Sequence, residues 1–251
     1  MLELDRRDAS VVQPAVLGVA VSRTAALSTS RATWLAGLGA CLLVLAILAL
    51  WIDLPVAQFI KGRGLSGELR RLVRLSEAFG WGGTVGIIIL LAALLDPRGW
   101  RVAWRLAICS YGAGITADGI KLLIGRLRPA HANLAGSVSE TFAAWLPAWR
   151  AESLGLDYGH NLQSFPSGHA ATAAGLAVAL AFLYPRARWL FVAFAVLASL
   201  QRVEAQSHFV SDVLAGAALG CLLGALCDIP GPLQRWLLRK ESRPGVANNS
   251  I

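Results

Sequence analysis

Residues 34–52 read WLAGLGACLLVLAILALWI, without a single charged side chain. An α-helix needs about 20 consecutive apolar residues to cross the hydrocarbon core of a bilayer. The sequence therefore predicts a membrane-spanning helix that begins near Trp34 and ends near Ile52.

Five further apolar segments extend this pattern along the chain. We expect them to be helices at residues 81–95, 102–127, 167–184, 189–201 and 208–227. Over all 251 residues, 56% are hydrophobic and 15% are charged, whereas soluble domains carry about 25% charged residues. The prediction is an all-α integral membrane protein with a bundle of about six transmembrane helices.

The remaining segments suggest how the chain is organised. We expect a poorly ordered cytosolic tail at 1–30, a six-helix domain at 31–230 with its catalytic core at 118–215, and a basic cytosolic tail at 231–251. Residues 61–79 have the apolar spacing of a helix lying in the membrane interface, or of an amphipathic helix packed on the bundle. The long polar connection at 130–165 contains aromatic residues that favour a lid at the interface: Phe142, Trp145, Trp149 and Tyr158.

The net charge of +8 does not indicate nucleic-acid binding. The sequence has no nucleic-acid-binding motif, and basic loops and tails beside membrane spans contact anionic headgroups. Lys and Arg are more numerous on the side of the two tails, which places both termini in the cytoplasm. The four cysteines have no CxxC spacing and the acidic residues do not cluster, so we expect neither a metal site nor a cofactor.

Alternating crossings of the membrane bring four helix ends to one face. The helices at 102–127 and 189–201 end there, and those at 167–184 and 208–227 begin there. Three clusters of polar residues lie at these ends, and we expect them to form a single site.

The first cluster is KLLIGRLRP, residues 121–129. Positions seven apart lie on one stripe of a helix, so Lys121 and Arg128 should face a common pocket. Two cations in one pocket suit an anion with several oxygens, such as phosphate. Asp118 is expected to pair with Lys121, and a purely structural pair is the alternative. We interpret Arg126 as a basic residue that extends toward the lipid headgroups.

The second cluster is FPSGH, residues 165–169, at the start of an apolar helix. Ser167 is a good N-cap, and the N–H groups of a helix N-terminus bind anions. Gly168 allows close approach of the backbone to a phosphate, and His169 should point at the same anion. The alternative is a capped helix with an interfacial histidine.

The third cluster contains Gln201, Arg202, His208 and Asp212. His208 and Asp212 are four residues apart and therefore neighbours on one helix face. A carboxylate bonded to one imidazole nitrogen leaves the other nitrogen as a nucleophile. Arg202 adds a third cation for phosphate, although a structural His–Asp pair is the alternative. The remaining histidines, His131 and His160, are interpreted as ordinary loop residues.

Together the clusters indicate phosphoryl transfer without a metal. His208 would attack phosphorus with Asp212 orienting its ring, and His169 would protonate the leaving oxygen. The Lys and Arg side chains would supply the positive charge that stabilises the transferred group.

The motifs K-x6-R-P, P-S-G-H and R-x5-H-x3-D, in this order, resemble those of the type 2 phosphatidic acid phosphatase superfamily. That family also includes acid phosphatases and vanadium haloperoxidases. The resemblance implies His208 as nucleophile and His169 as general acid, with phosphate bound by Lys121, Arg128, Ser167, Gly168 and Arg202. Gln201 stands where the family usually has serine, which leaves its contact with phosphate in question.

The sequence thus predicts a membrane lipid phosphatase that forms a phosphohistidine, with its site facing the periplasm of a bacterial inner membrane. The expected partners are the bilayer and a phosphorylated lipid, with undecaprenyl pyrophosphate, phosphatidylglycerophosphate, phosphatidic acid and lipid A phosphates as candidates by resemblance. The alternatives are a lipid phosphotransferase and a protein that binds or transports lipids without chemistry.

Overall fold

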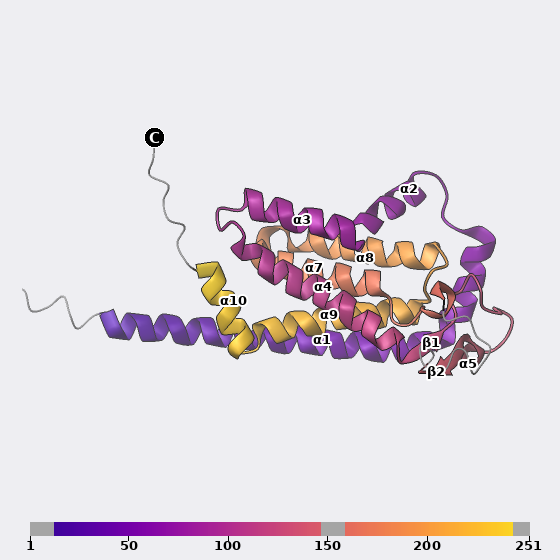
Figure 1. The fold of residues 1–251 in the computed structure, drawn as a ribbon, viewed down its shortest axis with the longest axis horizontal. Coiled ribbons are helices and arrows are strands. Elements are labelled where there is room, and N and C mark those ends of the chain that lie inside the picture. Colours follow the sequence, from indigo (N-terminus) through magenta and orange to yellow (C-terminus); the bar gives the residue numbers. More distant parts are fainter. Residues whose placement is uncertain (1–12, 147–158, 243–251) are drawn as a thin grey trace, which may run out of the picture.

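A computed structural model describes residues 13–146 and 159–242, which are mostly helical (Figure 1). The longer helices are α1 (Gln13–Arg63), α3 (Gly82–Leu95), α4 (Arg101–Lys121), α7 (Gly168–Leu183), α8 (Arg188–Glu204), α9 (Val210–Asp228) and α10 (Pro232–Ser242). The shorter elements are α2 (Gly67–Leu75), η1 (Ser76–Phe79), β1 (Ile124–Arg126), α5 (Val138–Thr141), β2 (Phe142–Trp145), η3 (His160–Leu162) and η4 (Pro185–Ala187).

Two of these helices are long and apolar enough to cross a membrane, as judged by length and composition within the described residues. They are Thr29–Arg63, which is part of α1, and α9. The bent pair formed by Gly67–Phe79 and α3 makes a third if it counts as one span, with an angle of 68° between its halves. The predicted number of six spans is therefore not confirmed, because helices such as α7, at 16 residues, are too short.

Helix α1 is longer than predicted at both ends. The prediction of a poorly ordered tail at 1–30 is wrong for residues 13–30, which are helical, and residues 1–12 lie outside the described part. Proline occurs at the start of this segment, at Pro14, where the first turn of a helix tolerates it. At the other end the helix continues past Ile52 and through Pro55 to Arg63.

Helix α7 is the centre of the bundle, where it packs against α4, α8 and α9, and α1 lies along α9 (Figure 1). Small residues allow the central helices to approach closely. A Cβ atom added to Gly175 of α7 would lie 2.0 Å from the carbonyl oxygen of Cys109 in α4. One added to Gly220 of α9 would lie 2.5 Å from the backbone nitrogen of Gly175.

The substitution Gly175→Ala is expected to destabilise the protein by about 1–3 kcal/mol, because α4 and α7 must separate to accept the new methyl group. Gly37→Ala is the matched control, since an added Cβ at Gly37 meets nothing within 4 Å. Alanine is also the better helix former, so this control should be neutral or slightly stabilising. Thermal unfolding in detergent measures both variants, and equal effects would contradict the close packing of α7.

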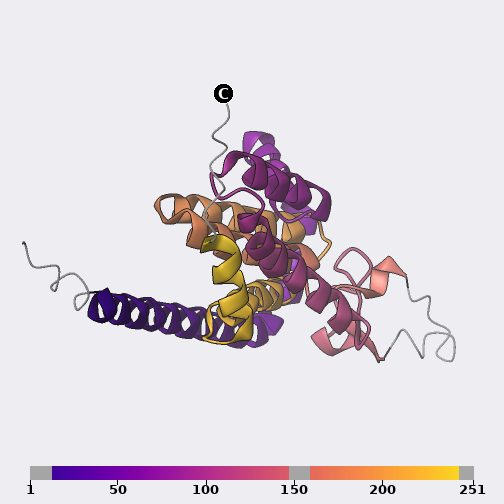
Figure 2. The ribbon, with the colours of Figure 1, turned by 60° about the vertical axis from the view of Figure 1, so that its left-hand side comes forward.

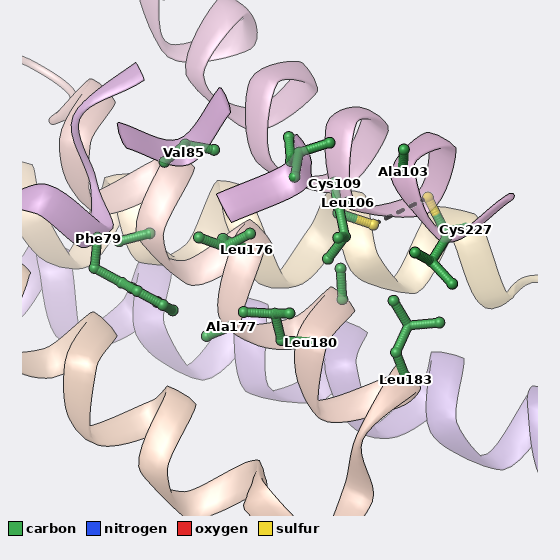
Figure 3. Close-up of a cluster of buried hydrophobic side chains, with 14 of the residues drawn as sticks. Phe79, Val85, Ala103, Leu106, Cys109, Leu176, Ala177, Leu180, Leu183 and Cys227 are labelled. Atoms are coloured by element: carbon green, nitrogen blue, oxygen red, sulfur yellow. Dashed lines mark hydrogen bonds between the residues drawn. The ribbon is translucent and has the colours of Figure 1, made fainter. Parts of the chain in front are cut away.

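The main hydrophobic core is formed by side chains from η1, α3, α4, α7, α8, α9 and α10, part of which Figure 3 shows. Leu106, Leu176 and Val85 are fully buried in it. Cys109 and Cys227 face each other there, with their sulfur atoms 3.4 Å apart. Both are free thiols, as expected for cysteines that act as small buried residues.

The outer surface of the bundle is apolar, as a bilayer requires. Trp34 and Trp51 of α1 are 78% and 79% exposed and lie about 25 Å apart along the helix at 1.5 Å per residue. Tryptophan is enriched at the two membrane–water interfaces, so this spacing fits the thickness of a hydrocarbon core. Together with the spanning helices, this surface identifies a membrane protein.

The C-terminal segment is not simply a basic tail, because α10 packs across α4 and α9 (Figure 2). Buried Arg105 of α4 donates hydrogen bonds to Glu241 at 2.7 Å and to Asp228 at 3.0 Å. Leu237 is fully buried. The predicted basic segment is therefore a packed helix over α10, its cytosolic side stays a prediction, and residues 243–251 lie outside the described part.

The segment at 61–79 forms the end of α1, then α2 and η1, so the predicted amphipathic helix is confirmed in a shorter form. Val73 is buried, whereas Leu69, Leu72 and Leu75 are exposed. Arg70 donates to the Glu204 carboxylate of α8 at 2.8 Å, which fixes α2 against the bundle.

The long connection after α4 contains secondary structure that the sequence did not predict. β1 and β2 form a small two-stranded antiparallel sheet in a chain that is otherwise mostly helical, as predicted. Trp145 of β2 is 61% exposed, whereas Trp149 and Tyr158 lie outside the described residues. The interface lid remains a prediction.

Candidate active site

The end of α4, the start of α7, the end of α8 and the start of α9 meet beside the β1–β2 sheet (Figure 1). The His208 N–H donates to the carbonyl of Arg202 at 3.2 Å, and burial with the nearby charges of Arg128, Arg202 and Lys121 lowers the pKa of its imidazole. The predicted convergence of the four helix ends is therefore present in the structure.

Lys121 ends α4 and its ammonium group lies 2.8 Å from the Asp118 carboxylate, so the predicted pair is present. A Cβ atom added to Gly168 would lie 3.3 Å from the Lys121 Nζ and 3.4 Å from the Asp118 carboxylate. The absence of a side chain at Gly168 thus brings the start of α7 against this ion pair.

Arg128 lies at the site, but not on the helix that carries Lys121. The prediction of one helix over 102–127 is wrong, because α4 ends at Lys121 and residues 124–126 pair with β2. Gly125 and β-branched Ile124 suit a strand better than a helix. The Arg128 Nε donates to the carbonyl of His160 at 2.9 Å. Burial and the nearby Arg202 lower the pKa of Arg128 to about 10, so it remains a cation at neutral pH.

Ser167 caps α7 as predicted, with its hydroxyl oxygen accepting from the Ala170 N–H at 3.4 Å. The Ser167 N–H donates to the carbonyl of Asp212 at 3.0 Å, which joins the start of α7 to α9. His169 lies in the first turn of α7. Within the described residues, its Nε2 is a buried atom without a hydrogen-bond partner.

His208 is 2% exposed and is held by a backbone group. Its Nδ1 lies 2.7 Å from the carbonyl oxygen of Ser164, whereas the nearest Asp212 oxygen is 3.9 Å away. The expectation that Asp212 binds the imidazole directly is therefore wrong, because the Ser164 carbonyl occupies that position. A carbonyl only accepts, so Nδ1 carries the proton and Nε2 keeps its lone pair. Burial, with Arg128 and Arg202 nearby, lowers the pKa of His208 well below its ordinary value and keeps the ring neutral.

Asp212 instead organises the groups around His208. Its carboxylate accepts from the Ser164 hydroxyl at 2.6 Å and from the Phe209 N–H at 2.8 Å. Its other oxygen accepts from the guanidinium of Arg126. Asp212 therefore fixes the residues on both sides of the imidazole without touching it.

Arg126 is completely buried, so its interpretation as a residue that extends toward the headgroups is wrong. Its guanidinium bridges Asp212 of α9 and Asp53 of α1, the latter at 2.7 Å. Asp53 also accepts from the Ser211 N–H at 3.0 Å. The rings of Phe142 and Phe209 lie 4.5 and 4.4 Å from the guanidinium carbon. Sequence analysis missed both Arg126 and Asp53, although a carboxylate directly after a 19-residue apolar run was a usable signal.

Arg202 is the third cation, and both of its terminal nitrogens are engaged. Nη1 donates to Glu77 at 2.6 Å and Nη2 donates to Ser207 at 2.9 Å. Gln201 donates to the other oxygen of Glu77 at 3.1 Å. Glu77 of η1 is a residue of the site that sequence analysis missed, because it lies outside the three clusters.

The described residues include no group of three or more His, Cys, Asp and Glu side chains that could hold a metal ion. The positive charge at the site comes from Lys121, Arg128 and Arg202, which lie beside His208 and His169. Such cations are suited to stabilise the charge of a phosphoryl group.

Comparison with known proteins supports a relationship over most of the chain. A lipid A 1-phosphatase of Rhizobium johnstonii is 32% identical over 65% of this chain and 63% of its own length. A decaprenylphosphoryl-5-phosphoribose phosphatase of Mycobacterium tuberculosis is 30% identical over 77% of this chain and 91% of its own length. The chain spans just under two thirds of the Rhizobium relatives, at 63% and 62% for the Rhizobium johnstonii and Rhizobium etli enzymes.

Among solved structures, a PAP2-type phosphatidylglycerolphosphate phosphatase from Bacillus subtilis matches 75% of this chain and 92% of its own length. Its sequence identity is 20% and the TM-score is 0.48. The assignment of this chain to a family rests on its sequence. A sequence model of the PAP2 superfamily matches residues 100–228, just over half of the chain and the whole stretch from α4 to the end of α9. This match and the Mycobacterium relative show that the chain belongs to the PAP2 superfamily.

Proposed function

We propose that this protein is a lipid phosphatase that hydrolyses a phosphomonoester or pyrophosphate through a phosphohistidine at His208. One observation carries the proposal: Nδ1 of His208 is held by a carbonyl, so Nε2 is available for attack beside three cations. The relatives named as phosphatases support the same class of reaction.

In the first step Nε2 of His208 forms a bond to phosphorus as the bond to the lipid oxygen breaks. His169 gives a proton to that oxygen, which leaves as an alcohol or as a lipid phosphate. In the second step water attacks the phosphohistidine while the now neutral His169 accepts a proton from it, and inorganic phosphate is released. Lys121, Arg128 and Arg202 stabilise charge on the phosphoryl oxygens in both steps.

Asp212 acts here as a positioning residue. It holds the Ser164 hydroxyl and the Phe209 N–H, and Ser164 in turn holds the His208 ring through its carbonyl. Gly168 presents its N–H at the start of α7 to the phosphate. Ser167 offers its hydroxyl instead, because its own N–H already donates to the Asp212 carbonyl.

A substrate in the bilayer is supported by the exposed apolar surface of the bundle. Phosphatidic acid, phosphatidylglycerophosphate, undecaprenyl pyrophosphate and the phosphates of lipid A are the candidates. The start of α1 and the whole of α10 lie at the end opposite β1 (Figure 1). Such an arrangement agrees with cytoplasmic termini and a periplasmic site in a bacterial inner membrane.

Phosphate release by the purified full-length protein, measured across these lipids in mixed micelles, tests the proposal. We expect release to continue in excess EDTA and to be inhibited by vanadate, which mimics pentacoordinate phosphorus. Complete loss of activity in EDTA, restored by a divalent cation, would contradict the metal-independent mechanism.

Two alternative functions predict different results in the same assay. A phosphotransferase would consume the lipid phosphate and form a second phosphorylated lipid without releasing inorganic phosphate. A lipid-binding or transport protein would bind the same lipids and leave them unchanged. The presence of both histidines favours chemistry, since binding requires only the cations.

A further inference from the structure

Glu77 contacts the candidate site from outside the three motifs. It lies in η1, between the amphipathic helix α2 and the apolar helix α3. One of its carboxylate oxygens accepts from Nη1 of Arg202 at 2.6 Å and lies 3.9 Å from Nε2 of His169. The other oxygen accepts from Nε2 of Gln201 at 3.1 Å. A single side chain therefore contacts a phosphate-binding cation and approaches the proposed acid.

The backbone turn that follows Glu77 also packs closely against the backbone of His169. The N–H groups of Gly80 and Trp81 both donate to the carbonyl of Glu77, at 2.9 and 3.0 Å. A Cβ atom added to Gly80 would lie 2.7 Å from the carbonyl oxygen of His169. The turn after Glu77 is therefore packed directly on the first turn of α7, which fixes the carboxylate relative to the imidazole.

Gln201 also contacts Glu77, and it occupies the position of the third motif at which this chain differs from its family. Serine is usual there, and its shorter side chain would not span the distance that the Gln201 amide covers to reach Glu77. The unusual residue in the third motif thus has a partner in η1. The two residues form a pair whose joint effect is measurable.

His169 lies among positive charges, so a nearby carboxylate would favour the protonated form of its imidazole. Burial and the charges of Arg202, Lys121 and Arg128 lower the pKa of His169 to about 4, whereas Asp118 raises it. The Glu77 carboxylate of η1 lies 3.9 Å from Nε2 of the same ring. Like charges disfavour a protonated imidazole, whereas an adjacent carboxylate favours it.

We propose that Glu77 is a positioning residue that holds Arg202 and Gln201 in place and supports the protonated form of His169. This inference rests on the proposed function, since it assigns Glu77 to the step in which His169 protonates the leaving oxygen. Glu77 itself gives up no proton and forms no bond to phosphorus.

The leaving group provides the decisive test. An alkoxide needs a proton as the P–O bond breaks, whereas p-nitrophenolate leaves without one. Loss of proton donation therefore slows the cleavage of an alkyl phosphate and has little effect on p-nitrophenyl phosphate. A variant that is merely misfolded or loosened loses activity toward both substrates equally.

We expect Glu77→Gln to lower kcat/KM for dioctanoyl phosphatidic acid roughly tenfold, a fraction of the 10²–10⁴-fold effect of a general acid. For p-nitrophenyl phosphate the loss should be several-fold smaller, because it reports only the loosened Arg202 and not the missing proton. Gln201→Ser should produce a smaller loss of the same kind in the wild-type background. It should produce no further loss in the Glu77→Gln background, because the partner is already absent.

Glu68→Gln is the matched control, since Glu68 belongs to the same segment and pairs with the exposed side chain of Arg71. Equal losses with the two substrates would overturn the proposal in favour of a structural role. A gain with both would show that Glu77 only competes with phosphate for Arg202. If the wild-type protein releases no phosphate from any lipid, the proposed function fails, whereas an active wild type with an unaffected Glu77→Gln variant rejects only this inference.

Discussion

Replacement of His208 by alanine is expected to lower phosphate release by on the order of 10⁴-fold or more, because removal of a nucleophile leaves only binding and charge stabilisation. The side chain is buried, and its loss leaves the Ser164 carbonyl without its imidazole partner. An unsatisfied buried group costs about 1–3 kcal/mol, so the folded fraction must be measured beside activity.

His208→Asn is the more informative variant. The asparagine amide nitrogen takes the place of Nδ1 and keeps a donor for the Ser164 carbonyl, but nothing replaces Nε2. We therefore expect a well-folded protein that is as inactive as the alanine variant. His131→Ala is the control, because His131 is exposed and was assigned no role in catalysis.

Trapping of the intermediate tests the same residue directly. Wild-type protein incubated with ³²P-labelled lipid phosphate and quenched in alkali should retain acid-labile label, and both His208 variants should retain none. Label that persists in His208→Asn would assign the nucleophile to another residue.

The substitution Arg126→Met is expected to destabilise the protein by about 3–5 kcal/mol, the usual effect of breaking a buried ion pair from one side. The guanidinium has no exposed surface and serves two buried carboxylates, Asp53 and Asp212. Methionine fills much of the same volume, so the loss reports the two unpaired negative charges rather than a cavity.

Thermal or denaturant unfolding in detergent measures this effect. Arg71→Met is the control, because Arg71 forms an exposed pair with Glu68 and such pairs contribute about 0–1 kcal/mol. The triple variant Arg126→Met, Asp53→Asn, Asp212→Asn removes both unpaired charges and should recover part of the stability. A change below about 1 kcal/mol for Arg126→Met would contradict the buried network.

The residues of the site were predicted from the sequence more accurately than the secondary structure that carries them. Lys121, Arg128, His169, Arg202 and His208 belong to helix ends and loops that meet at one end of the bundle, as expected from the order of the apolar helices. The helix expected to join Lys121 to Arg128 does not exist, since residues 124–126 pair with β2 instead. Strand pairing depends on a partner distant in the chain, and helical spacing contains no information about that partner.

The missed residues have the same explanation. Arg126 was assigned to the headgroups because no local partner was visible, and its carboxylate at Asp53 is 73 positions away. The Ser164 carbonyl, which replaced Asp212 as the partner of His208, is a backbone group that no side-chain pattern reports. Glu77 was overlooked because it follows an amphipathic helix whose charges appeared to face water or headgroups.

The contact of Asp53 with Ser211 joins residues 158 positions apart, and thereby the first and last helices of the catalytic domain. A chain emerging from the ribosome inserts α1 long before α9 exists. Asp53 and Arg126 therefore gain their contacts with Ser211 and Asp212 only after α9 has been made. A product truncated before α9 lacks these contacts, and the segment that carries His208 is not yet fixed in it.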